Sequence, residues 1–352
     1  MFVNRRWFIK NTALLAAGVK LGFGRSEKTS AAVQSQDPLP LSGIIDTHVH
    51  AVGSAAYTND LGDKVKTLAD KISINSRYPE LLKSAPSGPR VDLSDNLIQH
   101  MDNNGISHAM VQPDWLGTND LVAHTVKKHP DRFSGLLALL PWTALPKDPH
   151  TEERALADAR ARAAEEVSRG VEELGLKGVG EFFVRSFTME THPEKIAKDM
   201  KPVMDAVAKY KIPIQISTGW SMFPHSLSYG DPIWVDEVAY ANPEVPIILT
   251  KMGRSIQHLF DNALMVASRN TNVYFDIVDS SSQHIRQAID RIGSQRLMFG
   301  TDWGGVTRWV REPYGVVEKH KRLLDGANLS SSERAQVEWK TAANIFRLNR
   351  TT

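Results

Sequence analysis

The sequence contains no cysteine, and this single absence excludes disulfide bonds, thiolate metal ligands and thiol nucleophiles. Long hydrophobic runs are absent as well. The apolar stretch near the N-terminus, residues 12–24, is 13 residues long, whereas a transmembrane helix needs about 20. A metal ion bound by this chain would therefore be held by His, Asp and Glu side chains.

A strong net charge is also lacking. Of the 42 Lys/Arg and 40 Asp/Glu residues, six and one respectively lie in residues 1–32, so the remainder holds 36 basic and 39 acidic residues. Without its first 32 residues the chain is slightly acidic. We therefore expect a small-molecule substrate and no nucleic-acid or anionic-membrane partner, and we leave a homo-oligomer open.

The first forty residues have the composition of a targeting segment. Residues 4–10 (NRRWFIK), a mild apolar run and a small-x-small site near residues 30–32 resemble a twin-arginine export signal. The alternative, a short membrane anchor, is disfavoured by the length of the apolar run. We predict a signal over residues 1–32, a linker over 33–40, a barrel domain over 41–349, and a periplasmic protein without a stable membrane anchor after processing.

The chain does contain a His-x-His pair at the end of an apolar run, residues 41–50 (LSGIIDTHVH). Side chains alternate faces along a strand, so His48 and His50 point the same way and can share one divalent cation. With 12 histidines in 352 residues, such a pair also arises by chance. Its context favours a site, because small residues follow and the pair lies where a strand ends in a loop.

From residue 93 onward, amphipathic helical patterns alternate with short apolar runs, which indicates βαβ units and a parallel sheet. Eight strands over roughly 310 residues fit a (β/α)8 TIM barrel of the α/β class. A doubly wound open sheet is the alternative, but no Gly-x-Gly-x-x-Gly turn follows the first strand. Residues 51–90, with a helix-like patch at 61–72, are expected to form an inserted loop or lid after the first strand. The later strands are expected at residues 108–112, 133–141, 178–184, 213–218, 246–252, 273–278 and 296–302.

Seven stretches along the chain carry a family resemblance: IIDTHVH, MDNNGISHAMVQP, KKHPDRFSGLLALLP, PEVPIILTKMGR, NVYFDI, RIGSQRLMFGTDW and TAANIFRL. Together they resemble the amidohydrolase-2 branch of the metal-dependent amidohydrolase superfamily, which includes aminocarboxymuconate semialdehyde decarboxylase-like enzymes and lactone hydrolases. The resemblance implies that His48, His50 and Asp302 are metal ligands. Two imidazoles and a carboxylate suit one divalent metal, with Zn²⁺ preferred and Mn²⁺ or Fe²⁺ as alternatives.

Two positions depart from the family pattern. Ser217 and Lys251 stand where the branch has a metal-binding histidine and a histidine that polarises the substrate. Glu181 lies where other branches place a metal-bound Lys or Glu, so it could complete the ligand set, or it could instead form an ion pair with Lys251 or Arg185. Lys251 could steady a carboxylate or developing oxyanion, or serve as a structural salt bridge.

Further residues near the predicted strand ends are candidates for substrate binding. Arg254 could bind a substrate carboxylate or cap the next helix, and His225 could replace the missing imidazole or be merely solvated. Asp46 could orient a ligand or cap the barrel floor. An aromatic collar, or equally the packing of loops, is expected of Trp115, Trp142, Trp220 and Trp303.

The predicted function is a metal-dependent hydrolase that activates water against an ester, lactone or amide of a small aromatic or carboxylated substrate. Asp302 would be both ligand and base, with Lys251 assisting. Nonoxidative decarboxylation by a lyase is the enzymatic alternative. An alternative of another class is a periplasmic pseudoenzyme or binding protein that has lost the fifth- and sixth-strand histidines.

Overall fold

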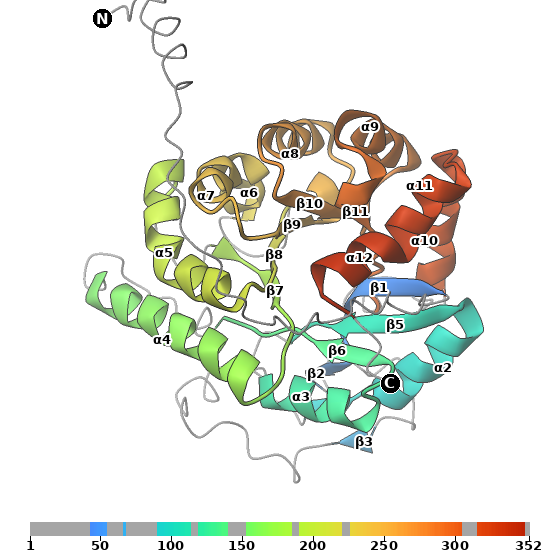
Figure 1. Ribbon diagram of the computed structural model, residues 1–352, viewed down its shortest axis with the longest axis horizontal. Coiled ribbons are helices and arrows are strands. Elements are labelled where there is room, and N and C mark those ends of the chain that lie inside the picture. Colours follow the sequence, from blue (N-terminus) through green and yellow to red (C-terminus); the bar gives the residue numbers. More distant parts are fainter. Residues whose placement is uncertain are drawn as a thin grey trace, which may run out of the picture. The chain divides into compact units, whose positions relative to one another are not determined.

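The computed structural model describes residues 43–54, 66–67, 90–113, 119–139, 153–184, 190–219, 226–304 and 315–348. All of them belong to the larger of the two compact units into which the chain divides, Leu39–Thr352. Within these ranges, eight parallel strands surround a common axis (Figure 1). They are β1 (Ile44–Val49), β5 (Ile106–Val111), β6 (Phe133–Gly135), β7 (Val179–Phe182), β8 (Ile214–Ser217), β9 (Ile247–Thr250), β10 (Val273–Asp276) and β11 (Leu297–Met298).

The strands close into a barrel. Strands β1, β5 and β6 form one sheet, and β7 to β11 form another in sequence order. A parallel bridge between Leu137 and Val179 joins β6 to β7, and a second between Val49 and Trp303 joins β1 to the segment after β11. The expected (β/α)8 barrel is thereby confirmed, and the open doubly wound sheet is not what the chain forms.

Helices follow the strands and cover the outside of the barrel (Figure 1). Their ends carry recognisable signals: α2 stops at Gly105, whose φ of 67° a residue without Cβ adopts freely, and the hydroxyl of Ser281 caps α9. The helices are α2 (Ser94–Asn104), α3 (Asn119–Lys128), α4 (Glu153–Glu172), α5 (Pro193–Tyr210), α6 (Ser226–Gly230), α7 (Val235–Ala241), α8 (Gln257–Arg269), α9 (Ser282–Ile292), α10 (Gly315–Gly326), α11 (Ser331–Ala335) and α12 (Thr341–Ile345), and of these α6 and α12 lie at the ends of the barrel.

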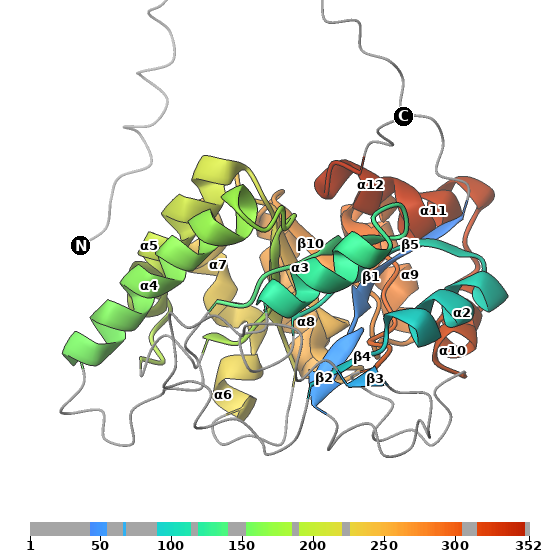
Figure 2. The ribbon, with the colours of Figure 1, turned by 90° about the horizontal axis from the view of Figure 1, so that it is seen from below.

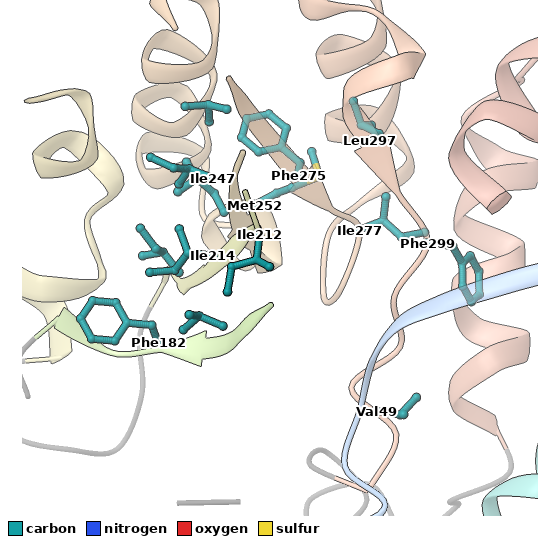
Figure 3. Packing of buried hydrophobic residues seen from close by; sticks show 14 of the residues in the cluster. Val49, Phe182, Ile212, Ile214, Ile247, Met252, Phe275, Ile277, Leu297 and Phe299 are labelled. Carbon is teal, nitrogen blue, oxygen red and sulfur yellow. The ribbon is translucent and has the colours of Figure 1, made fainter. Parts of the chain in front are cut away.

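Apolar side chains pack on both faces of the strands. The larger cluster fills the space between strands and helices, and Figure 3 shows it from close by around Ile214, Ile247 and Phe275. A second cluster joins inward residues such as Ile45 and Met298 to α12 and its neighbours. Because α12 and this apolar cluster close one end of the barrel, we expect the polar functional residues at the opposite end, where the strands have their carboxyl ends.

The insertion after β1 is described only in part. Strands β2 (Val52–Ser54), β3 (Lys66–Thr67) and β4 (Arg90–Asp92) form a small antiparallel sheet, which Figure 2 shows at the same end of the barrel as α6. The helix expected at residues 61–72 is wrong at β3, because Lys66 and Thr67 pair with β4. The remainder of the expected lid lies outside the described residues. No helix in the described ranges is both long and apolar enough to cross a membrane.

Candidate metal centre

The site begins with the two histidines at the end of β1. His48 is fully buried and the side chain of His50 is 15% exposed. Both Nε2 atoms face a carboxylate oxygen of Asp302, at 3.7 Å from His48 and 3.1 Å from His50. One donor atom from each of these three residues lies within 4.8 Å of the others. The structure therefore brings together the three residues that the resemblance predicts as metal ligands.

Backbone pairing at the barrel seam fixes this arrangement. The amide of Asp302 donates to the carbonyl of His48 at 2.8 Å, and the amide of His50 donates to the carbonyl of Trp303 at 2.7 Å. Asp302 has a φ of 58°, a left-handed conformation that a non-glycine residue adopts only when its surroundings hold it. The two histidines and the aspartate are thus locked in register although they come from opposite ends of the domain.

Glu181 reaches the same point from β7. The pairing of β7 with β8 is irregular between Val179 and Phe182, and the amide of Glu181 donates to Oε1 of Gln112 at 3.0 Å. A local irregularity of this kind re-aims a side chain. Oε2 of Glu181 consequently lies 3.5 Å from Nε2 of His48 and 3.5 Å from Nε2 of His50.

These distances fit a shared cation. Two ligands bound at about 2.1 Å with tetrahedral angles lie about 3.4 Å apart, and the four imidazole–carboxylate distances are 3.1, 3.5, 3.5 and 3.7 Å. Nε2 of His48 is buried and finds no hydrogen-bond partner among the described residues. A donor set of two imidazoles with one or two carboxylates suits Zn²⁺, Mn²⁺ or Fe²⁺.

Lys251 lies beside this group with its side chain 1% exposed. Its ammonium forms an ion pair with Oε1 of Glu181, lies 3.5 Å from Oδ2 of Asp302, and shares Oε1 with the hydroxyl of Ser217, which donates at 3.1 Å. The expected ion pair of Glu181 with Lys251 therefore forms on Oε1, whereas Oε2 faces the two imidazoles, and the role of Glu181 as a metal ligand stays a prediction. Lys251 is engaged by carboxylates of the protein itself.

The charged groups of the site shift one another's pKa values toward the ionised forms. Burial alone would lower the pKa of His48, and Lys251 acts in the same direction, but Asp276, Asp302 and Glu181 raise that pKa to about 10. Burial would raise the pKa values of Glu181 and Asp302, yet the ammonium of Lys251 and the imidazoles bring both below their ordinary values. Without a metal ion the site is a network of ionised groups, with both carboxylates in the form that binds cations.

The sequence profile that describes the amidohydrolase family matches residues 45–348, a range that begins and ends with the barrel. The chain belongs to the amidohydrolase family.

Three proteins illustrate what this amidohydrolase is similar to. Gamma-resorcylate decarboxylase of Rhodococcus jostii (strain RHA1) is 24% identical over 274 residues, covering 66% of this chain and 76% of that protein. A manganese-bound 5-carboxyvanillate decarboxylase of Novosphingobium aromaticivorans has a TM-score of 0.53 at 17% identity, covering 87% and 97% of the two chains. A 4-oxalomesaconate hydratase of Rhodopseudomonas palustris has a TM-score of 0.59 at 17% identity, covering 86% and 95%. At these identities the two structures support the fold alone.

Two buried aspartates support the site of this amidohydrolase from behind. Asp46, the expected orienting residue, accepts hydrogen bonds from the amides of His48 and Thr301 and from the hydroxyl of Thr301, and burial raises its pKa to about 7. It therefore holds backbone, not an imidazole ring. The ring of His48 instead has Nδ1 3.0 Å from Oδ2 of Asp276. From the sequence, Asp276 belonged only to the strand expected over residues 273–278 and had no assigned role.

Of the residues expected to bind the substrate, two belong to the described part of the chain. Trp303 is 2% exposed and stacks on His100 at 5.7 Å, so its ring packs the barrel wall of this amidohydrolase. Arg254 has a left-handed φ of 54°, and its side-chain stem lies close against Gly219. The other candidates for substrate binding lie outside the described residues and stay predictions: Trp115, Trp142, Trp220 and His225. The ion pair expected between Glu181 and Arg185 also stays a prediction, because Arg185 lies outside the described residues.

Proposed function

We propose that this protein is a metal-dependent lyase that removes CO2 from a small aromatic or unsaturated carboxylic acid. The observation that carries the proposal is the group of His48, His50 and Asp302, with Glu181 adjacent, at the carboxyl ends of the barrel strands. Decarboxylation is preferred to the hydrolysis that the sequence favoured, because a curated relative is aligned over 76% of its length and is a gamma-resorcylate decarboxylase.

The proposed reaction breaks the bond between the carboxyl carbon and the ring or alkene carbon. The electron pair stays on that carbon, which then takes up one proton, so one carboxylate and one proton give CO2 and a product with hydrogen in place of the carboxylate. A divalent cation, when bound, supplies Lewis acidity that draws electron density from a substrate oxygen. In this proposal His48, His50 and Asp302, together with Glu181, would hold that cation.

We assign the proton transfer to Asp302. Its Oδ1 faces His50 and its Oδ2 lies 3.5 Å from the ammonium of Lys251, so the carboxylate lies at the edge of the donor group and beside a hydrogen-bond donor. Lys251 has a raised pKa, because the carboxylates of Asp302 and Glu181 outweigh its burial. It stays charged and keeps both partners ionised between turnovers.

Hydrolysis of a lactone, ester or amide is the second candidate. The specific observation in its favour is that Asp302 is ionised beside the imidazoles, which suits a base that takes a proton from water. The two reactions differ in whether water adds to carbon or carbon loses CO2, and their products separate them directly.

The test uses the purified chain loaded with Zn²⁺ or Mn²⁺. It is incubated with carboxyl-¹³C-labelled aromatic acids, including 2,6-dihydroxybenzoate, the substrate named for similar enzymes, and in parallel with a panel of lactones. We expect ¹³CO2 and, in D2O, one deuterium at the carbon that lost it, with at least a 100-fold loss in Asp302→Asn.

Ring opening of a lactone without CO2 release from any acid would favour the hydrolase. A chain that binds no stoichiometric metal, and whose thermal stability in Zn²⁺ is the same with and without His48→Ala, would be a binding protein, and both enzymatic proposals would fail.

A further inference from the structure

Asp276, the last residue of β10, is completely buried. Its Oδ1 accepts hydrogen bonds from the amide of Lys251 at 2.7 Å and from the amide of Val278 at 3.2 Å. Its Oδ2 lies 3.0 Å from Nδ1 of His48. One carboxylate therefore contacts two segments that supply the site, β1 through the side chain of His48 and the turn directly after β9 through the amide of Lys251.

The contact with His48 determines which ring nitrogen carries the proton. A carboxylate only accepts hydrogen bonds, so Nδ1 is the nitrogen that donates to Asp276. The other nitrogen, Nε2, is directed between Glu181 and Asp302 at 3.5 and 3.7 Å. In a neutral imidazole this leaves Nε2 with its lone pair toward the donor group, the form that binds a metal ion.

The contact with Lys251 acts on the backbone. Residues 251–255 all have positive φ, beginning with 70° at Lys251, although only Gly253 adopts that region without strain. The left-handed turn is held at Lys251 by Asp276 and at Gly253 by the hydroxyl of Thr218, which accepts from its amide at 3.3 Å. This turn sends the Lys251 side chain to Glu181 and Asp302.

We propose that Asp276 is a positioning residue that prepares His48 as a metal ligand and, through the same carboxylate, sets the turn that delivers Lys251 to Glu181. The inference rests on the proposed metal site and not on the identity of the reaction.

Asp276→Asn tests the first half of the role. Oδ1 of the new amide can keep both backbone hydrogen bonds, which leaves its NH2 group facing Nδ1 of His48. That nitrogen must then accept, so the proton of neutral His48 moves to Nε2 and blocks the metal position. We expect the Kd for Zn²⁺, measured by chelator competition without any substrate, to rise 10–100-fold.

Asp279→Asn is the matched control. Asp279 lies three residues further on, pairs with Lys319 at 3.0 Å and has a φ of 49°, a conformation that asparagine tolerates well. Its Zn²⁺ affinity should stay within about threefold of the unsubstituted chain, because it makes no contact with His48. Equal affinities for Asp276→Asn, Asp279→Asn and the unsubstituted chain would overturn the proposal.

A second measurement needs no substitution at Asp276. In the Zn²⁺-loaded chain, ¹⁵N NMR of labelled histidine should show a proton on Nδ1 of His48, assigned by its absence in His48→Gln. A proton on Nε2 instead would overturn the proposal even where Asp276→Asn fails to fold. Failure of the decarboxylase assay leaves both measurements intact, so the two proposals can fail separately.

Discussion

Lys251 is a buried cation, and we expect its removal to lower the stability of the protein most when no metal ion is bound. In Lys251→Met, the carboxylates of Glu181 and Asp302 lose their ammonium partner, and breaking a buried pair in this way costs about 3 kcal/mol. We expect a lower melting temperature in EDTA and a larger rise on adding Zn²⁺ than in the unsubstituted chain, measured by differential scanning fluorimetry.

Lys209→Met is the comparison for this prediction, since Lys209 is 65% exposed and pairs only at the surface. Its melting temperature should not change in either buffer. If Lys251→Met melts in EDTA at the same temperature as the unsubstituted chain, the ammonium does not compensate the two carboxylates.

His108, which lies outside the metal site, should make the stability of the protein depend on pH. Its Nδ1 faces the carbonyl of Asp131 at 3.4 Å, its Nε2 lies 3.0 Å from the hydroxyl of Ser134, and burial lowers its pKa from 6.5 to about 4. Between these values the unfolded chain binds a proton that the folded chain does not, so stability is full above pH 6.5 and falls toward pH 4, by up to about 3 kcal/mol.

The measurement is the change in melting temperature between pH 7 and pH 4.5. The drop should be smaller in His108→Asn, whereas substitution of the exposed His258 by asparagine should leave it unchanged. Identical drops in all three proteins would show that folding does not lower the pKa of His108.

For the individual residues of the site, the sequence predicted some and missed others, and each miss has a physical reason. His48 and His50 followed from the alternation of side chains along one strand, and Asp302 from the family resemblance. The role of Asp276 could not be predicted, because a hydrogen bond between residues 228 positions apart depends on how strands pair and not on local sequence. The split use of Glu181 depends on the local irregularity of β7, which no spacing rule indicates.

Among the elements, β7 depends on a glycine. A Cβ at Gly180 would collide with Oε1 of Gln112, and would lie 2.7 Å from Cδ of Pro113. We expect Gly180→Ala to lose about 1–3 kcal/mol of unfolding free energy and to bind Zn²⁺ more weakly, because the displaced Gln112 no longer fixes the amide of Glu181. Chemical denaturation and chelator competition measure the two effects.

Gly170→Ala in α4 separates packing from positioning. Gly170 lies on a helix of the outer layer and not on a strand, and its Cβ would meet the end of the flexible Leu137 side chain at 2.9 Å. Its Zn²⁺ affinity should not change. Equal losses of affinity in both variants would indicate a general loosening of the barrel instead of a local effect on Glu181.

The strands and helices were predictable because their apolar periodicities are strong, whereas their ends were not. The sixth strand was expected to continue to Met252 but ends at Thr250, where the left-handed turn begins. The eighth was expected over residues 296–302 and has only two residues, Leu297–Met298. Beyond them the amide of Phe299 donates to the carbonyl of Val337, which lies in the π-helical turn Gln336–Lys340. Each difference comes from a contact with a distant segment.

For the molecule as a whole, the N-terminal segment predicts export through the twin-arginine route to the periplasm. Replacing Arg5 and Arg6 together by lysine should leave full-length precursor inside the cell, because that signal is read through its arginine pair. Cell fractionation and the mass of the exported chain test this in a host that has the pathway. Arg25→Lys, the same change outside the pair, should export normally, and equal periplasmic yields of the two proteins would count against a twin-arginine signal.

The seam that joins β1 to the segment after β11 also sets an order of events during folding. Asp46 and Thr301, which are bonded across it, are 255 positions apart, and contacts of such long range form late because the intervening loop must first be closed. The donor group is therefore complete only when the last strand has docked on the first. A growing or truncated chain that ends before Asp302 lacks one carboxylate of this group, so we expect tight cation binding only after synthesis and barrel closure are finished.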